Sequence, residues 1–226
     1  MPESRAAKQA RAASIMKELA SAYPDAKIAL AFRTPFELLV ATILSAQCTD
    51  ERVNMVTPAL FAKYPTAREL ARARPPSLEK AIRSTGFFRA KTRSLLGMSK
   101  ALVERHGGEV PQAREALMEL PGVGLKTANV VIGNAFGGQA LAVDTHVFRV
   151  SQRLGLARSD DPDDVHDQLV RVLPPDSLTQ ATHLMITHGR RTCVALKPKC
   201  PVCPVRSLCP WPHKTGAPAR ARGAAS

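Results

Sequence analysis

Apolar side chains recur along this chain at the three-to-four-residue spacing of helices, and turn residues separate the runs. Residues 4–22 place their apolar side chains on one face and run up to Pro24, which predicts an amphipathic helix. A second run opens at residues 34–37 (TPFE), with a capping threonine, a proline at the first helical position and a glutamate three residues after the cap. These signals predict a strongly apolar helix that continues to Ser45.

The rest of the chain repeats this pattern of apolar runs bounded by caps and glycines. A second capping pattern spans Thr66 to Glu69 and opens a shorter helix. The pattern predicts further helices over residues 77–85, 90–105, 113–120, 125–136, 145–154, 162–172 and 177–188. No stretch alternates apolar and polar residues over the length of a strand, so the predicted fold class is all-α.

Composition supports a basic, helical protein that binds a polyanion. The 226 residues are 45% hydrophobic but only 4% aromatic, and the formal net charge is +13. Removing the +2 of residues 1–20 and the +3 of residues 210–226 leaves +8, so most of the charge belongs to the folded body. Nucleic acid is the partner that this charge favours, ahead of a membrane surface; the alternative is a basic protein with no such partner.

Neither membrane insertion nor secretion is expected. No apolar run approaches the roughly 18 residues that a spanning helix needs, and residues 1–19 lack the continuous apolar core of a signal peptide. We expect an intracellular protein, cytoplasmic and associated with the nucleoid, and a monomer. The polar residues 213–226 are expected to form a disordered basic tail.

Four cysteines lie close together near the C-terminal end of the sequence. Cys193, Cys200, Cys203 and Cys209 have the spacing C-x6-C-x2-C-x5-C, and Cys48 is the only other cysteine. Four thiolates suit a tetrahedral zinc ion or a [4Fe-4S] cluster. The long gaps on either side of one C-x2-C favour the iron–sulfur cluster over zinc, and both over disulfides.

A glycine turn, residues 121–124 (PGVG), joins two of the predicted helices. Gly122 and Gly124 let the backbone adopt positive φ and approach another backbone closely, and the turn leaves amide groups free at the start of the next helix. With Val123, they are candidate contacts to a DNA phosphate in a helix–hairpin–helix. The alternative is an ordinary pair of helices joined by a tight turn.

Lys126 falls in the first turn of the helix that follows this hairpin. The positive end of a helix disfavours a nearby ammonium charge, which is expected to lower the pKa of the amine and to favour a neutral nucleophile. The alternative is a solvated lysine that contacts phosphate.

Residues 143–147 (VDTHV) contain the next candidate site. Asp144 is placed to cap the following helix, and a fixed carboxylate beside a reacting sugar would stabilise positive charge or handle protons. Thr145 and His146 are candidate DNA contacts. His146 fits a ligand or a base less well than a packed, hydrogen-bonded side chain.

Four segments in this order resemble the endonuclease III family, bifunctional DNA glycosylases and apurinic/apyrimidinic lyases of base excision repair. The segments are residues 44–50 (LSAQCTD), 120–129 (LPGVGLKTAN), 143–147 and the four-cysteine cluster, and the likeness covers roughly residues 25–210. The resemblance implies two helical domains flanking a DNA-binding cleft. They are a six-helix barrel with the helix–hairpin–helix over residues 28–138 and an iron–sulfur domain formed by residues 1–27 and 139–212.

The same resemblance implies a [4Fe-4S] cofactor on the four cysteines and assigns roles to other residues. Lys126 corresponds to the nucleophile and Asp144 to the catalytic acid, acting on damaged double-stranded DNA. An oxidised pyrimidine would be flipped out and excised through a Schiff base, followed by β-elimination. Gln47 corresponds to the residue that fills the gap left by the flipped base.

Three further residues are candidate DNA contacts by the same likeness. Phe87 stands at the wedge position, where the family often has an aliphatic residue, which bears on opposite-base preference; the alternative is a core residue at a helix end. Lys197 and Lys199 correspond to basic residues that touch phosphates. Leu125 departs from the family, in which arginine is common before the lysine.

Two rival functions remain compatible with parts of the sequence. An adenine-specific mismatch glycosylase shares the fold and cluster but lacks the lysine after the hairpin, so Lys126 argues against it. A non-catalytic DNA-binding protein could use the hairpin and the cluster as a scaffold. In that case Lys126→Ala would leave binding unchanged, with no activity to lose.

Overall fold

In the computed structural model, which describes residues 3–216, all regular structure is helical, as predicted. The described part of the chain divides into two compact units. One consists of residues 28–140, and the other joins residues up to 27 with those from 141 onward. Among residues 3–216, no helix combines the length and apolar character needed to cross a bilayer.

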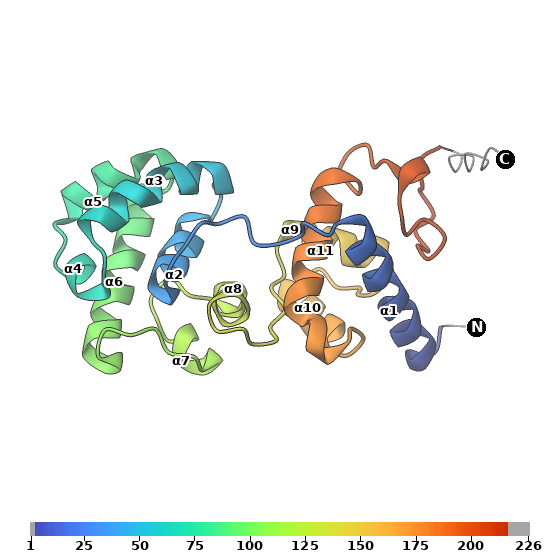
Figure 1. The fold of residues 1–226 in the computed structure, drawn as a ribbon, viewed down its shortest axis with the longest axis horizontal. Helices are drawn as coiled ribbons and strands as arrows, with labels where there is room; N and C mark the ends of the chain where they lie inside the picture. Colours follow the sequence, from blue (N-terminus) through green and yellow to red (C-terminus); the bar gives the residue numbers. More distant parts are fainter. Residues whose placement is uncertain (1–2, 217–226) are drawn as a thin grey trace. The chain divides into compact units, whose positions relative to one another are not determined.

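The unit of residues 28–140 is built around helix α2 (Figure 1). Every residue of α2 from Leu38 to Leu44 is buried, as expected for a helix that is apolar on all sides. The Thr34 hydroxyl accepts the Glu37 N–H at 3.2 Å, while the Glu37 carboxylate accepts the Arg33 N–H at 2.6 Å. The helices of this unit are α2 (Pro35–Leu44), α3 (Asp50–Lys63), α4 (Ala67–Ala71), α5 (Pro75–Ile82), α6 (Phe88–His106), α7 (Arg114–Met118) and α8 (Leu125–Ala135), with a 3-10 turn η1 (Arg83–Thr85).

Among residues 3–216, α3 is the long helix that the hydrophobic pattern did not predict. Thr49 caps it, and Asp50 and Glu51 in its first turn suit the positive end of the helix dipole. Its buried residues are few, and Pro58 interrupts the sequence in the middle of the helix. The row of buried apolar residues along α3 was therefore too short to predict a helix from the sequence.

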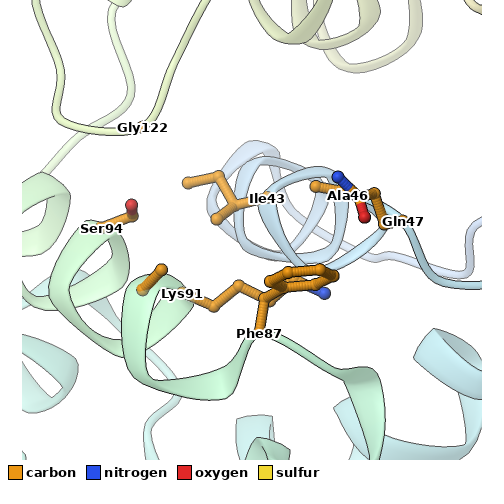
Figure 2. A pocket seen from close by; sticks show the side chains of 8 residues that line it. Ile43, Ala46, Gln47, Phe87, Lys91, Ser94 and Gly122 are labelled. Atoms are coloured by element: carbon orange, nitrogen blue, oxygen red, sulfur yellow. The ribbon is translucent and has the colours of Figure 1, made fainter.

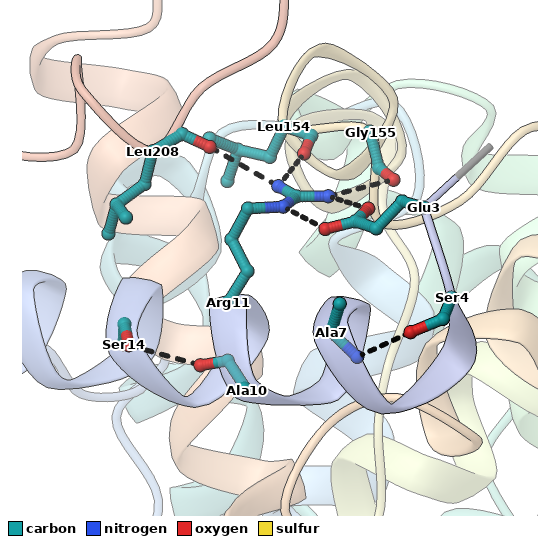
Figure 3. A network of polar contacts seen from close by, with 9 residues as sticks. All are labelled: Glu3, Ser4, Ala7, Ala10, Arg11, Ser14, Leu154, Gly155 and Leu208. Atoms are coloured by element: carbon teal, nitrogen blue, oxygen red, sulfur yellow. Dashed lines mark hydrogen bonds and ion pairs between the residues drawn. The ribbon is translucent and has the colours of Figure 1, made fainter. Parts of the chain in front are cut away.

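The second unit brings the N-terminal helix against the C-terminal half of the chain. Its helices are α1 (Arg5–Ala22), α9 (Thr145–Arg153), α10 (Pro162–Val170) and α11 (Leu178–Arg191), with 3-10 turns η2 (Pro175–Ser177) and η3 (Cys200–Val202). Figure 3 shows how Arg11 of α1 makes this connection. Its guanidinium donates to the carbonyls of Leu154 at 2.7 Å and Leu208 at 3.3 Å, and it pairs with the carboxylate of Glu3 at 2.8 Å.

The start of the expected basic tail is bonded to the cysteine-rich loop. The Thr215 hydroxyl donates to the Pro198 carbonyl at 2.5 Å, and the Arg206 guanidinium donates to the carbonyls of Thr215 and Gly216. The rest of that segment, residues 217–226, lies outside the described residues.

Candidate active site

The glycine turn packs tightly against helix α6. Gly122 has φ +82°, and a Cβ added there would lie 2.6 Å from the Ser94 Cβ. A Cβ on Gly97 of α6 would lie 3.1 Å from the Pro121 Cβ. Val123 is buried and its N–H donates to the Leu120 carbonyl at 3.1 Å. The turn therefore has a fixed position on α6.

Gly124 corrects part of the expectation for this turn. Its φ of −101° and ψ of −179° are extended angles that any residue adopts, so only Gly122 needs positive φ. Gly124 is the N-cap of α8, and a Cβ added to it would meet nothing within 4 Å. The space beside Gly124 is thus open to an approaching molecule.

Lys126 is the second residue of α8 and its side chain is exposed. Ala128, Asn129 and Val131 form the buried face of the same helix. The Asn129 side chain accepts a hydrogen bond from the Arg114 guanidinium at 3.0 Å, which ties α8 to α7. The buried face of α8 and the hydrogen bond to Arg114 therefore fix the position of the helix that carries Lys126.

Asp144 caps helix α9, as predicted. Its Oδ1 atom accepts the backbone N–H groups of His146 and Val147, both at 2.8 Å. Thr145 is exposed at the start of the helix. His146 is half-buried, and its Nδ1 lies 3.2 Å from the Arg149 guanidinium, in keeping with the expected hydrogen-bonded histidine.

Gln47, Phe87 and Gly122 line one pocket of about 270 Å³ (Figure 2). Phe87 is 64% exposed, so the alternative of a core residue is wrong. Gln47 has φ +50° and Phe87 has φ +46°, and in residues 3–216 these are the non-glycine residues with positive φ. The structure thus brings together three of the predicted DNA contacts, and the two that are not glycine, Gln47 and Phe87, have strained backbone angles.

Lys91, which the sequence did not single out, forms part of the same pocket. Its side chain is 5% exposed, and its Nζ donates to the carbonyls of Leu44 and Thr85, both at 2.8 Å. Burial lowers the pKa of this amine. Its only signal in the sequence was its position four residues after Phe87, which does not distinguish it from the other lysines of this basic chain.

The four clustered cysteines lie in the unit that contains Asp144. None is in a disulfide, and burial raises the pKa of the Cys203 thiol to about 11, with smaller contributions from the charges of the other three. The Arg153 guanidinium lies 3.5 Å from the Cys193 Sγ, and the Cys209 thiol donates to the Arg153 carbonyl at 3.4 Å. Arg153, the last residue of α9, therefore contacts two of the four clustered cysteines.

Lys197 and Lys199 lie in the loop between Cys193 and Cys200, and both are exposed. The Lys199 N–H donates to the Thr192 carbonyl at 2.9 Å, which anchors the loop to the end of α11. These lysines, the cysteines and residues 144–146 belong to one unit, while Lys126, Gln47, Phe87 and the glycine turn belong to the other.

Comparisons with known proteins give one consistent result. The family model described as the HhH-GPD superfamily base excision DNA repair protein matches residues 40–175. Endonuclease III of Synechocystis sp. is 51% identical over 207 residues, which cover 91% of this chain and 94% of the relative. Endonuclease III of Escherichia coli K12 is 38% identical, over 91% of this chain and 98% of the relative.

Solved structures agree. A non-covalent Endonuclease III-DNA complex has a TM-score of 0.83 and 47% identity, covering 87% of this chain and 92% of that chain. A trapped Endonuclease III-DNA covalent intermediate has the same TM-score and identity, over 86% and 92%. The chain therefore belongs to the HhH-GPD superfamily of base excision DNA repair proteins and, within it, to the endonuclease III family.

Proposed function

We propose that this protein is a bifunctional DNA N-glycosylase and apurinic/apyrimidinic lyase that removes oxidised pyrimidines from duplex DNA, with Lys126 as its nucleophile. The observation that carries the proposal is an exposed lysine in the first turn of α8, two residues after a glycine turn fixed on α6. Membership of the endonuclease III family supports the same reaction. The relative solved as a covalent intermediate with DNA is consistent with a nucleophilic enzyme.

The reaction would proceed through an imine. The neutral amine of Lys126 bonds to the sugar C1′ of the everted nucleotide, and the C1′–N bond to the base breaks, with its electron pair leaving on the base. The base takes up one proton and the attached amine loses one. The nitrogen lone pair then forms the C=N bond of a protonated Schiff base as the C1′–O4′ bond breaks, and O4′ takes up a proton. Removal of a proton from C2′ then breaks the C3′–O3′ bond, and water releases the lysine.

Asp144 would supply the negative charge for this reaction. Its Oδ1 atom is fixed by two backbone N–H groups of α9, so the carboxylate has one orientation before substrate arrives. A preorganised anion stabilises the positive charge that develops on the sugar ring as the base departs.

The remaining predicted contacts would hold damaged double-stranded DNA. The open space at Gly124, next to the amides that start α8, suits a backbone phosphate. Gln47 would enter the gap left by the flipped nucleotide, and Phe87, exposed at the same pocket, would stack on the opposite strand. Thr145, His146, Lys197 and Lys199 would contact the DNA from the second unit, and the protein would act as a monomer at the nucleoid in the cytoplasm.

The four clustered cysteines would hold a [4Fe-4S] cluster, and their spacing in the sequence and the family of the chain support this assignment. A single zinc ion, with bonds of about 2.3 Å, would draw four sulfur atoms to within about 3.8 Å of one another. Within residues 3–216, no three His, Cys, Asp or Glu side chains converge closely enough to hold one metal ion. Burial, and to a smaller extent the charges of the other clustered thiols, raises the pKa of the Cys203 and Cys209 thiols, so the four cysteines lie within electrostatic range of one another. When bound, such a cluster would crosslink the loop that carries Lys197 and Lys199.

Borohydride trapping tests the proposal directly. Wild-type protein mixed with a duplex containing an abasic site should form a covalent adduct on reduction, and Lys126→Ala should form none. Lys100→Ala, at an exposed position on α6, is the matched control and should trap at the wild-type level. Absence of an adduct with the wild type would remove the lyase assignment and favour a monofunctional glycosylase or a binding protein. An adduct with Lys126→Ala would assign the nucleophile to another amine.

A further inference from the structure

One buried ammonium joins the two strained turns of the pocket. Lys91 Nζ donates to the carbonyl of Leu44, the last residue of α2, and to the carbonyl of Thr85, the last residue of η1. Gln47 lies three residues beyond the first carbonyl, and Phe87 lies two residues beyond the second. The backbone N–H of Lys91 also donates to the Phe87 carbonyl at 3.0 Å.

This location is electrostatically suited to a cation. The last carbonyls of a helix lack intrahelical donors and carry the negative end of its dipole, so two such ends meeting at one point attract a positive charge. The ammonium replaces the water that these carbonyls would otherwise bind, and at 5% exposure the position admits little solvent. Hydrogen bonds from a charged donor are stronger than those from a neutral one.

The turns that follow these carbonyls need such an anchor. A side chain with a Cβ disfavours φ values of +50° and +46°, and residues hold them only when the surroundings fix them. Both side chains nevertheless reach the same pocket (Figure 2). The hydrogen bonds from the Lys91 ammonium fix the backbone two or three residues before each strained residue.

We propose that Lys91 is a positioning residue for damage recognition. By bonding the ends of α2 and η1, it would hold Gln47 and Phe87 in the conformations from which they enter the duplex together. This inference rests on the proposed function, because it assumes that the two side chains replace an everted nucleotide. It predicts that removing the ammonium weakens discrimination of damaged from undamaged DNA while leaving non-specific binding intact.

The experiment measures affinity for two duplexes, one undamaged and one with a tetrahydrofuran abasic analogue opposite 2-aminopurine. The analogue has no base to excise and no aldehyde, so the readout is independent of Lys126 chemistry. Wild-type protein and the control Lys100→Met should bind the analogue duplex preferentially and change the aminopurine fluorescence. Lys91→Met, which keeps the side-chain stem, should lose about tenfold of that preference and the fluorescence change.

A double-mutant cycle separates positioning from general stability. In a Gln47→Ala/Phe87→Ala background, Lys91→Met should cause no further loss of preference. Equal losses for damaged and undamaged duplex, an unchanged preference, or a further loss in that background would each overturn the proposal. If Lys91→Met does not fold, Lys91→Gln, which removes the charge and shortens the side chain, is measured in the same way. Selective loss of preference would then support the proposal, and equal or no loss would refute it.

Discussion

The two glycines of the hairpin should respond to alanine in opposite ways. At Gly122, the left-handed φ costs a residue with a Cβ about 1–2 kcal/mol. The new methyl group would also stand 2.6 Å from the Ser94 Cβ, an overlap that must be relieved by shifting α6 or the turn. Overpacking of this kind costs about 1–3 kcal/mol, so Gly122→Ala should lower the free energy of unfolding by about 2–5 kcal/mol.

Gly124→Ala is the matched control for stability. Its backbone angles suit alanine and a Cβ would meet nothing within 4 Å. Alanine is a poorer N-cap than glycine, but it also reduces the entropy of the unfolded chain, and these effects are each about 0.5–1 kcal/mol and of opposite sign. The free energy of unfolding should therefore stay within about 0.5 kcal/mol of the wild type. DNA affinity should fall, because the methyl group would enter the space proposed for a phosphate.

Urea denaturation followed by circular dichroism measures the first effect, and fluorescence anisotropy with a labelled duplex measures the second. Ser94→Gly should restore part of the stability of Gly122→Ala, since it removes the overlap but not the strain in φ. The reasoning would be refuted if both alanine variants unfolded at the same urea concentration, or if Gly124→Ala bound DNA as tightly as the wild type.

The other predictions concern charge and metal. Asp144→Asn should keep the helix cap and the melting temperature but lose most of the glycosylase rate. Asp144→Ala should lose most of that rate and also the cap, which costs about 1 kcal/mol of stability. Equal single-turnover rates for wild type and Asp144→Asn would contradict the proposed role. DNA affinity should fall with salt with a slope of about −0.9 per phosphate contact. Replacing both Lys197 and Lys199 by alanine should flatten that slope by about 1.8, and an unchanged slope would exclude phosphate contacts by these lysines. Purified protein should be brown and contain iron and sulfide, and Cys203→Ala should lose both; colourless protein with bound zinc would overturn the cluster assignment.

Sequence patterns predicted the helices whose ends carry strong local signals. The capping threonines at 34 and 66 and the aspartate at 144 act through their own next few residues, so their roles could be read without the fold. Helix α3 has comparable capping signals, but its narrow buried face and Pro58 concealed it. Capping signals therefore predicted a helix only where the helix also had a recognisable row of apolar residues.

Features set by distant parts of the chain could not be predicted. The glycines of the hairpin allowed positive φ at either position, yet Gly122 alone of the two adopts it, and Phe87, which is not a glycine, has left-handed angles. The role of Lys91 depends on two helix ends that are about 40 residues apart in the sequence and meet only in the folded unit. The residues around each helix end do not indicate that the two ends are in contact.

The pairing of Arg11 with carbonyls from Leu154 and Leu208 has a consequence for synthesis on the ribosome. Arg11 of α1 is translated 143 residues before Leu154, the first of these two partners, whereas all of residues 28–140 are available to one another earlier. Nascent chains released after residue 140 should therefore contain a folded middle segment with α1 still unpaired. The first helix made would be among the last to dock.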